Sequence, residues 1–234
     1  MMMYDMGLMV ITGVFMLIGL LVSSRLKSKF AKYSQERLTK GISGKEVAEK
    51  MLKDNGIYDV KVVSVQGQLT DHYNPADKTV NLSHDVYNGR HVAAAAVAAH
   101  ECGHAVQHAT AYAWLTMRSK MVPATQIAST MMGFISMALL FGFYFIPSMG
   151  NTLMLVFIIL QSVITLFTIV TLPVEIDASK RAIVWLDSAG ITYGSEHEDA
   201  KDALTWAAYT YIVAALGAIA SLLYMILRYT GSRD

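Results

Sequence analysis

Four apolar runs constrain the fold of this chain more than any other feature. They lie at about 6–22, 127–146, 152–172 and 207–227. Each has a length that can cross the roughly 30 Å hydrocarbon core of a bilayer as an α-helix. Hydrophobic residues make up 54% of the chain and charged residues 16%, and the mean hydropathy is +0.39. The sequence therefore predicts an integral membrane protein with four transmembrane helices.

Basic residues near the ends of these runs set the predicted orientation. They follow the first run, precede the second and follow the third: Arg25, Lys27, Lys29, Lys32, Arg37, Lys40, Arg118, Lys120, Lys180 and Arg181. By the positive-inside rule, both long polar segments face the cytoplasm and both termini lie outside. An even number of spans also requires the termini to share a side. The first residues include Asp5 and no Lys or Arg, so we expect the first run to be kept as an anchor.

The runs divide the chain into five predicted parts. These are an N-terminal transmembrane anchor at 1–24, a cytoplasmic α+β domain at 25–122, a transmembrane helical hairpin at 123–172, a cytoplasmic segment at 173–206 and a C-terminal transmembrane helix at 207–234. The hairpin is expected to turn at 147–151, the only link between its two spans.

Local signals place helices and strands in the polar segments. Capping boxes start helices at Ser43 and Ser195, and a Val-rich stretch at 58–66 predicts a strand. Two shorter strands, 69–73 and 79–82, are expected on either side of a turn that contains Asn74-Pro75. Two further helices complete the prediction, a long one at about 85–117 and a shorter one at 178–187.

Two histidines four residues apart carry the strongest chemical signal. On a helix, His100 and His104 face the same side and can bind one metal ion. Glu101 lies about 100° round the helix from His100, close enough to act on a metal-activated water without being a ligand. This is the arrangement of a zinc peptidase, with Glu101 as the general base.

Catalytic zinc needs three protein ligands and one open position. His108 continues the same face, but it lies about 12 Å along the helix axis from His100, too far for bonds of about 2 Å to one ion. Glu175 is the better third ligand, because it follows the third apolar run on the side already assigned to the metal helix. We expect His108 to be an outer-layer or packing residue.

Several neighbours of these residues have two open interpretations. Asp177 and Ser179 either orient the histidines or cap the following helix. Arg181 either neutralises an oxyanion or is a positive charge at the membrane boundary. Cys102 points away from the metal and is expected to be a packed small residue, and Gly103 is expected to allow close approach of another element.

Composition excludes some classes of function. The net charge of +1 gives no general attraction to nucleic acid, so no nucleic-acid partner is expected. A single cysteine excludes an intramolecular disulfide framework, which suits a domain in a reducing compartment.

The sequence resembles the YugP-like neutral zinc metallopeptidases of bacterial membranes. The resemblance covers nearly the whole chain and rests on three segments: 100–108 (HECGHAVQH), 74–83 with its Asn-Pro and Thr-Val-Asn-Leu-Ser, and 173–179 (PVEIDAS). It implies a Zn²⁺-dependent endopeptidase in the bacterial plasma membrane, with protein or peptide substrates.

A more distant resemblance links the chain to HtpX and the CAAX prenyl proteases, which are membrane gluzincins with a zincin-like domain. It implies Glu175 as the third ligand, although Ser179 stands where those enzymes have an outer-layer Asp. In such peptidases the substrate lies along an edge strand, and 79–83 resembles that strand.

Two alternatives remain at this point. One is an intramembrane site-2 type protease, but the nearest match to its third-ligand motif, Leu186-Asp187-Ser188, lies in a polar segment. The other is a non-catalytic scaffold in which zinc ties two segments together. Structural zinc usually has four protein ligands, and Glu101 would then have no role.

Overall fold

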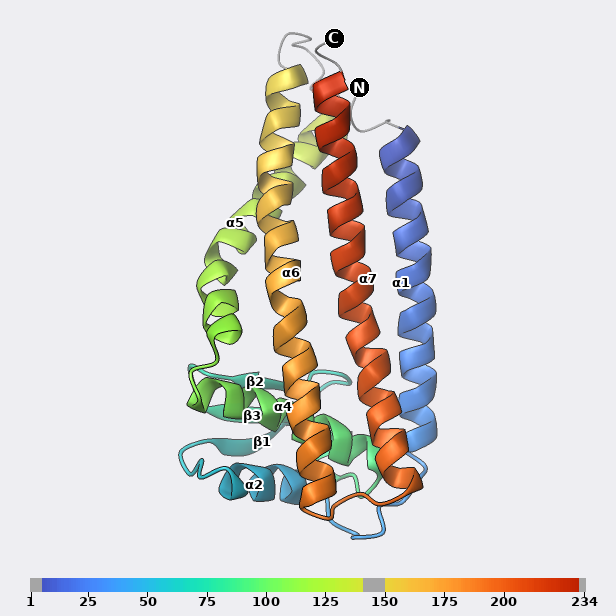
Figure 1. The fold of residues 1–234 in the computed structure, drawn as a ribbon, viewed down its shortest axis with the longest axis vertical. Helices are drawn as coiled ribbons and strands as arrows, with labels where there is room; N and C mark the ends of the chain where they lie inside the picture. The colour runs from blue at the N-terminus through green and yellow to red at the C-terminus, as the bar shows by residue number, and fades with distance from the viewer. Residues whose placement is uncertain (1–5, 141–149, 232–234) are drawn as a thin grey trace. The chain divides into compact units, whose positions relative to one another are not determined.

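The computed structural model describes residues 6–140 and 150–231 of the chain. In the described part, seven helices and three strands follow one another (Figure 1): α1 (Met6–Tyr33), α2 (Gly44–Asp54), β1 (Lys61–Val65), β2 (His72–Asn74), β3 (Thr79–Ser83), α3 (His84–Asn88), α4 (Val92–Ala109), α5 (Ala113–Leu140), α6 (Gly150–Ser188) and α7 (Ser195–Gly231).

These elements form two compact units, and α1, α5, α6 and α7 contribute residues to both. The helical unit comprises Met1–Leu21, Met117–Leu172 and Tyr211–Asp234. The α+β unit comprises Val22–Thr116 and Pro173–Thr210.

Three of the described helices are long and apolar enough to cross a membrane. They are α1, α6 from Thr152 onward and α7, with mean hydropathies of 2.4, 2.6 and 2.1 over their most apolar windows. The fourth predicted span, 127–146, is described only as far as Leu140, within α5. Its end and most of the predicted hairpin turn at 147–151 lie outside the described residues.

Small residues let helices approach closely in the helical unit. A Cβ added at Gly217 of α7 would lie 3.1 Å from the Phe15 ring of α1. On another side of α7, the Ala218 carbonyl accepts a hydrogen bond of 3.3 Å from Thr165 of α6. In lipid, the hydrophobic effect does not drive helices together, because the lipid tails are as apolar as the helix side chains. Helices therefore associate through close packing at small residues and through hydrogen bonds such as this one from a hydroxyl to a carbonyl.

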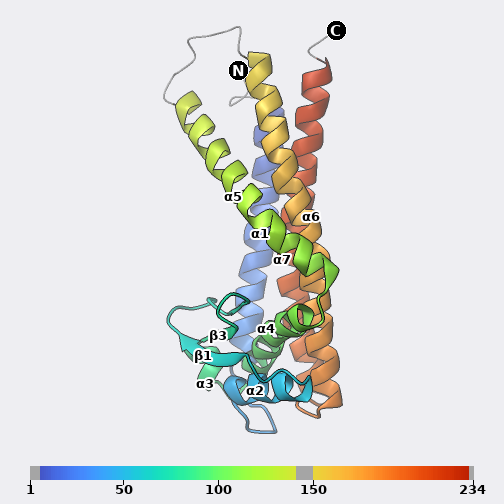
Figure 2. The same ribbon diagram turned by 90° about the vertical axis from the view of Figure 1, so that its left-hand side faces the viewer.

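The α+β unit is built on a small mixed sheet in the order β1-β3-β2. β1 pairs with β3 in parallel, and β2 pairs with β3 antiparallel. The β3 side chains of Val80 and Leu82 are fully buried. α2 and α4 lie side by side next to the sheet (Figure 2), and the buried alanines at 93–96 let the two helices pack closely.

The predicted start of α2 is confirmed. Ser43 accepts a hydrogen bond from the Glu46 backbone N–H, and the Glu46 side chain accepts one from Ser43 N–H, which completes the capping box. Asn55 is the C-cap, and Gly56 has a φ of +72°. By contrast, Ser195 is the first residue of α7 and not its N-cap, so its predicted capping box is wrong.

The single long helix predicted at about 85–117 is wrong, because this stretch forms α3, α4 and the start of α5. Gly89 is extended, and the His91 ring then caps α4 by accepting a hydrogen bond from Ala94 N–H. At the other end, Ala111 has a φ of +50°, which glycine adopts more easily than alanine. No glycine therefore marks this stop in the sequence.

α6 is longer than predicted, because it continues through Pro173 without a break. Proline leaves the carbonyl four residues earlier without its helical donor, which normally favours a boundary. Proline is nevertheless tolerated in long apolar helices that neighbouring groups support. As a result, Glu175, Asp177 and Ser179 lie on the same helix as the third apolar run.

Candidate metal centre

Two imidazoles on α4 form the base of the candidate site. His100 and His104 lie one turn apart, with ring centroids 4.9 Å apart and ring planes nearly perpendicular at 83°. His104 is buried and His100 is half-buried. The Ala-rich helix places both rings on one face, as the spacing predicts.

Glu175 of α6 completes a group of three. Its Oε2 lies 3.4 Å from His100 Nε2 and 3.6 Å from His104 Nε2. Bonds of about 2.1 Å in a tetrahedron set neighbouring ligand atoms about 3.4 Å apart, so these separations suit one zinc ion. Two imidazole nitrogens and one carboxylate are also a typical donor set for catalytic zinc. The residues present therefore fit the metal that the sequence predicts.

Gly103 explains how α6 comes so near to α4. A Cβ at this position would lie 2.6 Å from the Ala178 carbonyl oxygen of α6. Only glycine fits this approach of helix to backbone, as predicted for Gly103. Gly103 precedes His104 directly, and Ala178 lies three residues after Glu175, so this contact joins the two segments that carry the candidate ligands.

Cys102 is fully buried on the other side of α4. Its Sγ lies 3.6 Å from the Ala48 carbonyl of α2, and it is not part of the metal-binding group. The prediction of a packed small residue is confirmed.

A buried amide orients His104. The Gln107 Nε2 donates to the Val174 carbonyl at 2.8 Å and to Asp177 Oδ2 at 2.9 Å. Both partners are acceptors, so the amide oxygen must be the atom 3.0 Å from His104 Nδ1. His104 Nδ1–H therefore donates to it, which leaves the lone pair of Nε2 directed at the metal position.

Ser179 and Asp177 belong to the hydrogen-bond network around the candidate ligands, and both lie inside α6, so neither caps a separate helix. The Ser179 hydroxyl lies 3.1 Å from His100 Nδ1, the same relation that Gln107 has to His104. Asp177 is linked to the site through Gln107, and its Oδ2 also accepts a 2.6 Å bond from Arg181 Nε. Arg181 packs in turn over the Tyr112 ring at 5.7 Å.

We predict that Gln107→Leu weakens zinc affinity by about 10–100-fold, the usual cost of losing a partner that orients a metal-bound imidazole. Leucine has a similar size, but it cannot accept the proton of His104 Nδ1. Competition with a chelator of known affinity measures the change. Unchanged zinc affinity combined with a lower melting temperature would show that Gln107 only stabilises the fold.

Burial and neighbouring charges shift the pKa of the His104 imidazole in opposite directions. Burial lowers the pKa of its imidazole, but the hydrogen bond and charge of Glu175, together with the charge of Glu101, raise this pKa by more. Metal binding requires the neutral ring, so protons and zinc compete for this nitrogen at low pH.

Glu101 lies beside the candidate ligands on α4 and is hydrogen-bonded to the sheet. It is buried, and its Oε2 accepts a hydrogen bond of 3.1 Å from the Tyr73 backbone N–H of β2. This bond fixes the carboxylate next to the two imidazoles. The sequence did not predict a role for Tyr73. Its contact with Glu101 depends on how β2 packs against α4, which the local sequence does not show.

The expected edge strand at 79–83 is wrong, because β3 is the central strand of the sheet. β2 is the edge strand that lies against α4. In a strand, the N–H and C=O of one residue point to the same side. Since Tyr73 N–H points to Glu101, the Tyr73 carbonyl also faces away from β3.

The remaining histidines lie outside the metal-binding group. His108 Nδ1 bonds to the Tyr73 hydroxyl at 2.8 Å, which agrees with its predicted outer position. His72 contacts the Thr70 carbonyl, and His197 contacts Thr192. Among the described residues, His100, His104 and Glu175 are the one group found with metal-ligand geometry.

Comparisons with known proteins agree with this chemistry. The family model described as "Putative neutral zinc metallopeptidase" matches residues 8–230. The chain is 39% identical over 211 residues to the "Putative membrane protease YugP" of Bacillus subtilis (strain 168), which covers 90% of this chain and 91% of that protein. No solved structure gives a significant match.

Proposed function

Because the chain belongs to the family of neutral zinc metallopeptidases, we propose that it is a membrane-bound zinc endopeptidase that hydrolyses protein substrates at the cytoplasmic membrane surface. One observation carries the proposal: a buried carboxylate, Glu101, lies beside a group of three residues with the geometry of catalytic zinc ligands. His100, His104 and Glu175 hold Zn²⁺ in this proposal.

When bound, the zinc ion supplies a Lewis acid that acidifies water and polarises a peptide carbonyl. The protein supplies the proton transfers. Glu101 takes a proton from the attacking water and passes it to the leaving amine. The Tyr73 N–H holds Glu101 Oε2 in place, so the other carboxylate oxygen accepts the proton.

The edge strand β2 aligns the substrate in this proposal. An extended peptide can add to a sheet edge through main-chain hydrogen bonds. Because the Tyr73 N–H is used by Glu101, the Tyr73 carbonyl is the group that accepts a hydrogen bond from a substrate N–H. This contact places the peptide bond next to the general base.

The number of ligands favours catalysis over a structural role. Structural zinc sites usually have four protein ligands, whereas catalytic sites have three and keep one position open. The group found among the described residues has three. A scaffold would also have no use for a buried Glu101.

Orientation in the membrane is part of the proposal. The chain crosses the bilayer four times, with both termini outside and the site facing the cytoplasm. Support comes from the basic residues around the predicted cytoplasmic segments and from the three described helices that are apolar enough to span. An intramembrane site is less favoured, because the ligands lie in the unit that contains the sheet.

Metal removal tests the proposed function. Purified full-length protein should contain about one zinc per chain and cleave a mixed peptide library. Chelation should abolish cleavage, and added Zn²⁺ should restore it, whereas Mg²⁺ should not, because Mg²⁺ prefers oxygen ligands. Folded, zinc-loaded protein that cleaves no peptide in the library would instead support the scaffold.

A further inference from the structure

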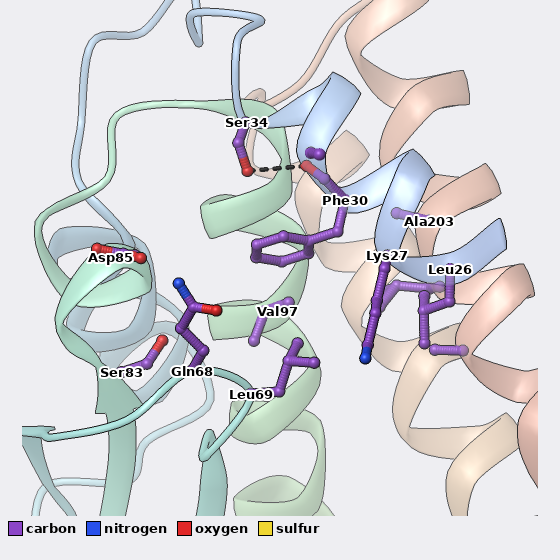
Figure 3. A pocket seen from close by; sticks show the side chains of 13 residues that line it. Leu26, Lys27, Phe30, Ser34, Gln68, Leu69, Ser83, Asp85, Val97 and Ala203 are labelled. Carbon is purple, nitrogen blue, oxygen red and sulfur yellow. Dashed lines mark hydrogen bonds between the residues drawn. The ribbon is translucent and has the colours of Figure 1, made fainter. Parts of the chain in front are cut away.

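A cavity of about 630 Å³ lies in the α+β unit (Figure 3). Its volume falls within the range of about 300–1,000 Å³ that is typical of ligand pockets. The apolar part of its wall comes from α1, the β1–β2 loop, α4 and α7: Leu26, Phe30, Leu69, Val97, Ala203 and Leu204. The Phe30 ring and the side chains of Leu69 and Val97 lie close together in Figure 3, with polar groups of Gln68 and Asp85 nearby.

Two residues that line this cavity are close in the chain to Glu101, the proposed general base, or to its hydrogen-bond partner Tyr73. On α4, Val97 lies four residues before Glu101, on the same helix face and about 6 Å away along the axis. In the β1–β2 loop, Leu69 lies four residues before Tyr73. The Tyr73 N–H donates its hydrogen bond to Glu101, so the chain segment that follows Leu69 also contacts Glu101. The cavity therefore lies about one helical turn from Glu101 along the same face of α4.

Leu69 lies in an unusual backbone conformation on the cavity wall. Its φ is +57°, in the left-handed region that glycine and asparagine adopt more easily. Its side chain is large, apolar and exposed. Leucine has no polar group that would stabilise this conformation locally, and the strained backbone places its exposed apolar side chain on the cavity wall.

We propose that the cavity binds a large apolar side chain of the peptide substrate, within about two residues of the bond that is cleaved. The estimate follows from the axial distance of about 6 Å and a rise of about 3.3 Å per residue in an extended peptide. This inference rests on the proposed function and specifies its substrate class.

The cavity also lies near the membrane surface along the helices that line it. Leu26 of α1 comes four residues after the apolar run 6–22, and Ala207 of α7, which also lines the cavity, is the first residue of the run 207–227. A headgroup layer is about 5–8 Å thick, or about four to five residues of helix. The side chain that the cavity accepts therefore belongs to a substrate segment that lies at the bilayer surface.

Narrowing the cavity tests the inference. Ala31 of α1 lines the cavity and is exposed, so Ala31→Trp reduces the cavity with little risk to the core. The matched control is Ser28→Trp, an exposed position on the same helix that does not line the cavity. Both full-length variants, in detergent with zinc, are tested on a peptide library that contains Phe, Leu, Ala or Asp at each position around the cleaved bond.

The native protein should prefer Phe or Leu over Ala and Asp at one position within two residues of the bond. Ala31→Trp should lower kcat/KM for Phe and Leu peptides by about 10–200-fold and change Ala peptides little, whereas Ser28→Trp should change neither. A native protein that cleaves peptides without this preference overturns the inference, as does an equal loss on all peptides with Ala31→Trp. Failure of the native protein to cleave any peptide overturns the proposed function itself.

Discussion

Replacing Glu101 with glutamine is expected to lower peptide hydrolysis by about 10²–10⁴-fold, the usual contribution of a general base, while zinc stays bound. An amide cannot accept the proton that the attacking water must lose. It can still accept the hydrogen bond from Tyr73 N–H, so the fold around β2 and α4 should be retained. The measurements are kcat on a cleaved peptide and zinc content per chain.

Glu49→Gln is the matched control for this substitution. Glu49 is a carboxylate in an exposed pair with Lys45 on α2, 3.6 Å apart. Its replacement should leave both zinc content and kcat unchanged. If Glu101→Gln keeps the native kcat, proton transfer by Glu101 must be abandoned. If it loses zinc, Glu101 acts on the metal site in a different way from the one proposed.

Replacing Glu175 with glutamine should remove both the metal and the activity. The carboxylate supplies the one negative charge among the three proposed ligands, and it is almost completely buried against two imidazoles. Its loss should weaken zinc affinity by more than the about 10–100-fold expected for partners that only orient a ligand. Zinc content after dialysis against a weak chelator measures the effect.

Asp187→Asn provides the comparison on the same helix. Asp187 is an exposed carboxylate twelve residues further along α6, and it should be replaceable without loss of zinc. A Glu175→Gln protein that keeps zinc with native affinity would exclude Glu175 as a ligand. The third ligand would then have to come from a different residue.

The sequence predicts those residues of the candidate site that are marked by a local sequence pattern. His100, Glu101 and His104 follow from helix periodicity within five residues. Glu175 follows from its place after the third apolar run and from family resemblance. The structure brings His100, His104 and Glu175 together, and their roles as ligands stay a prediction that the Glu175 variant tests.

Gln107 could not be predicted as the partner of His104. Its function depends on Val174 and Asp177, about 70 residues away on another helix. The order of the strands is equally non-local: β3 follows β2 in the chain, yet it lies between β2 and β1. The end of α4 was missed because Ala111 adopts a left-handed conformation that is rare for alanine.

The buried position of Cys102 has a consequence for redox control. Burial raises the pKa of its thiol well above the ordinary value, and the thiolate is the form that oxidants and disulfides attack. The sole cysteine of the chain is therefore not an accessible site for glutathionylation or sulfenic acid formation, although it lies two residues from both His100 and His104 in the chain. We therefore expect the proposed zinc centre to tolerate thiol oxidants that inactivate centres with thiolate ligands.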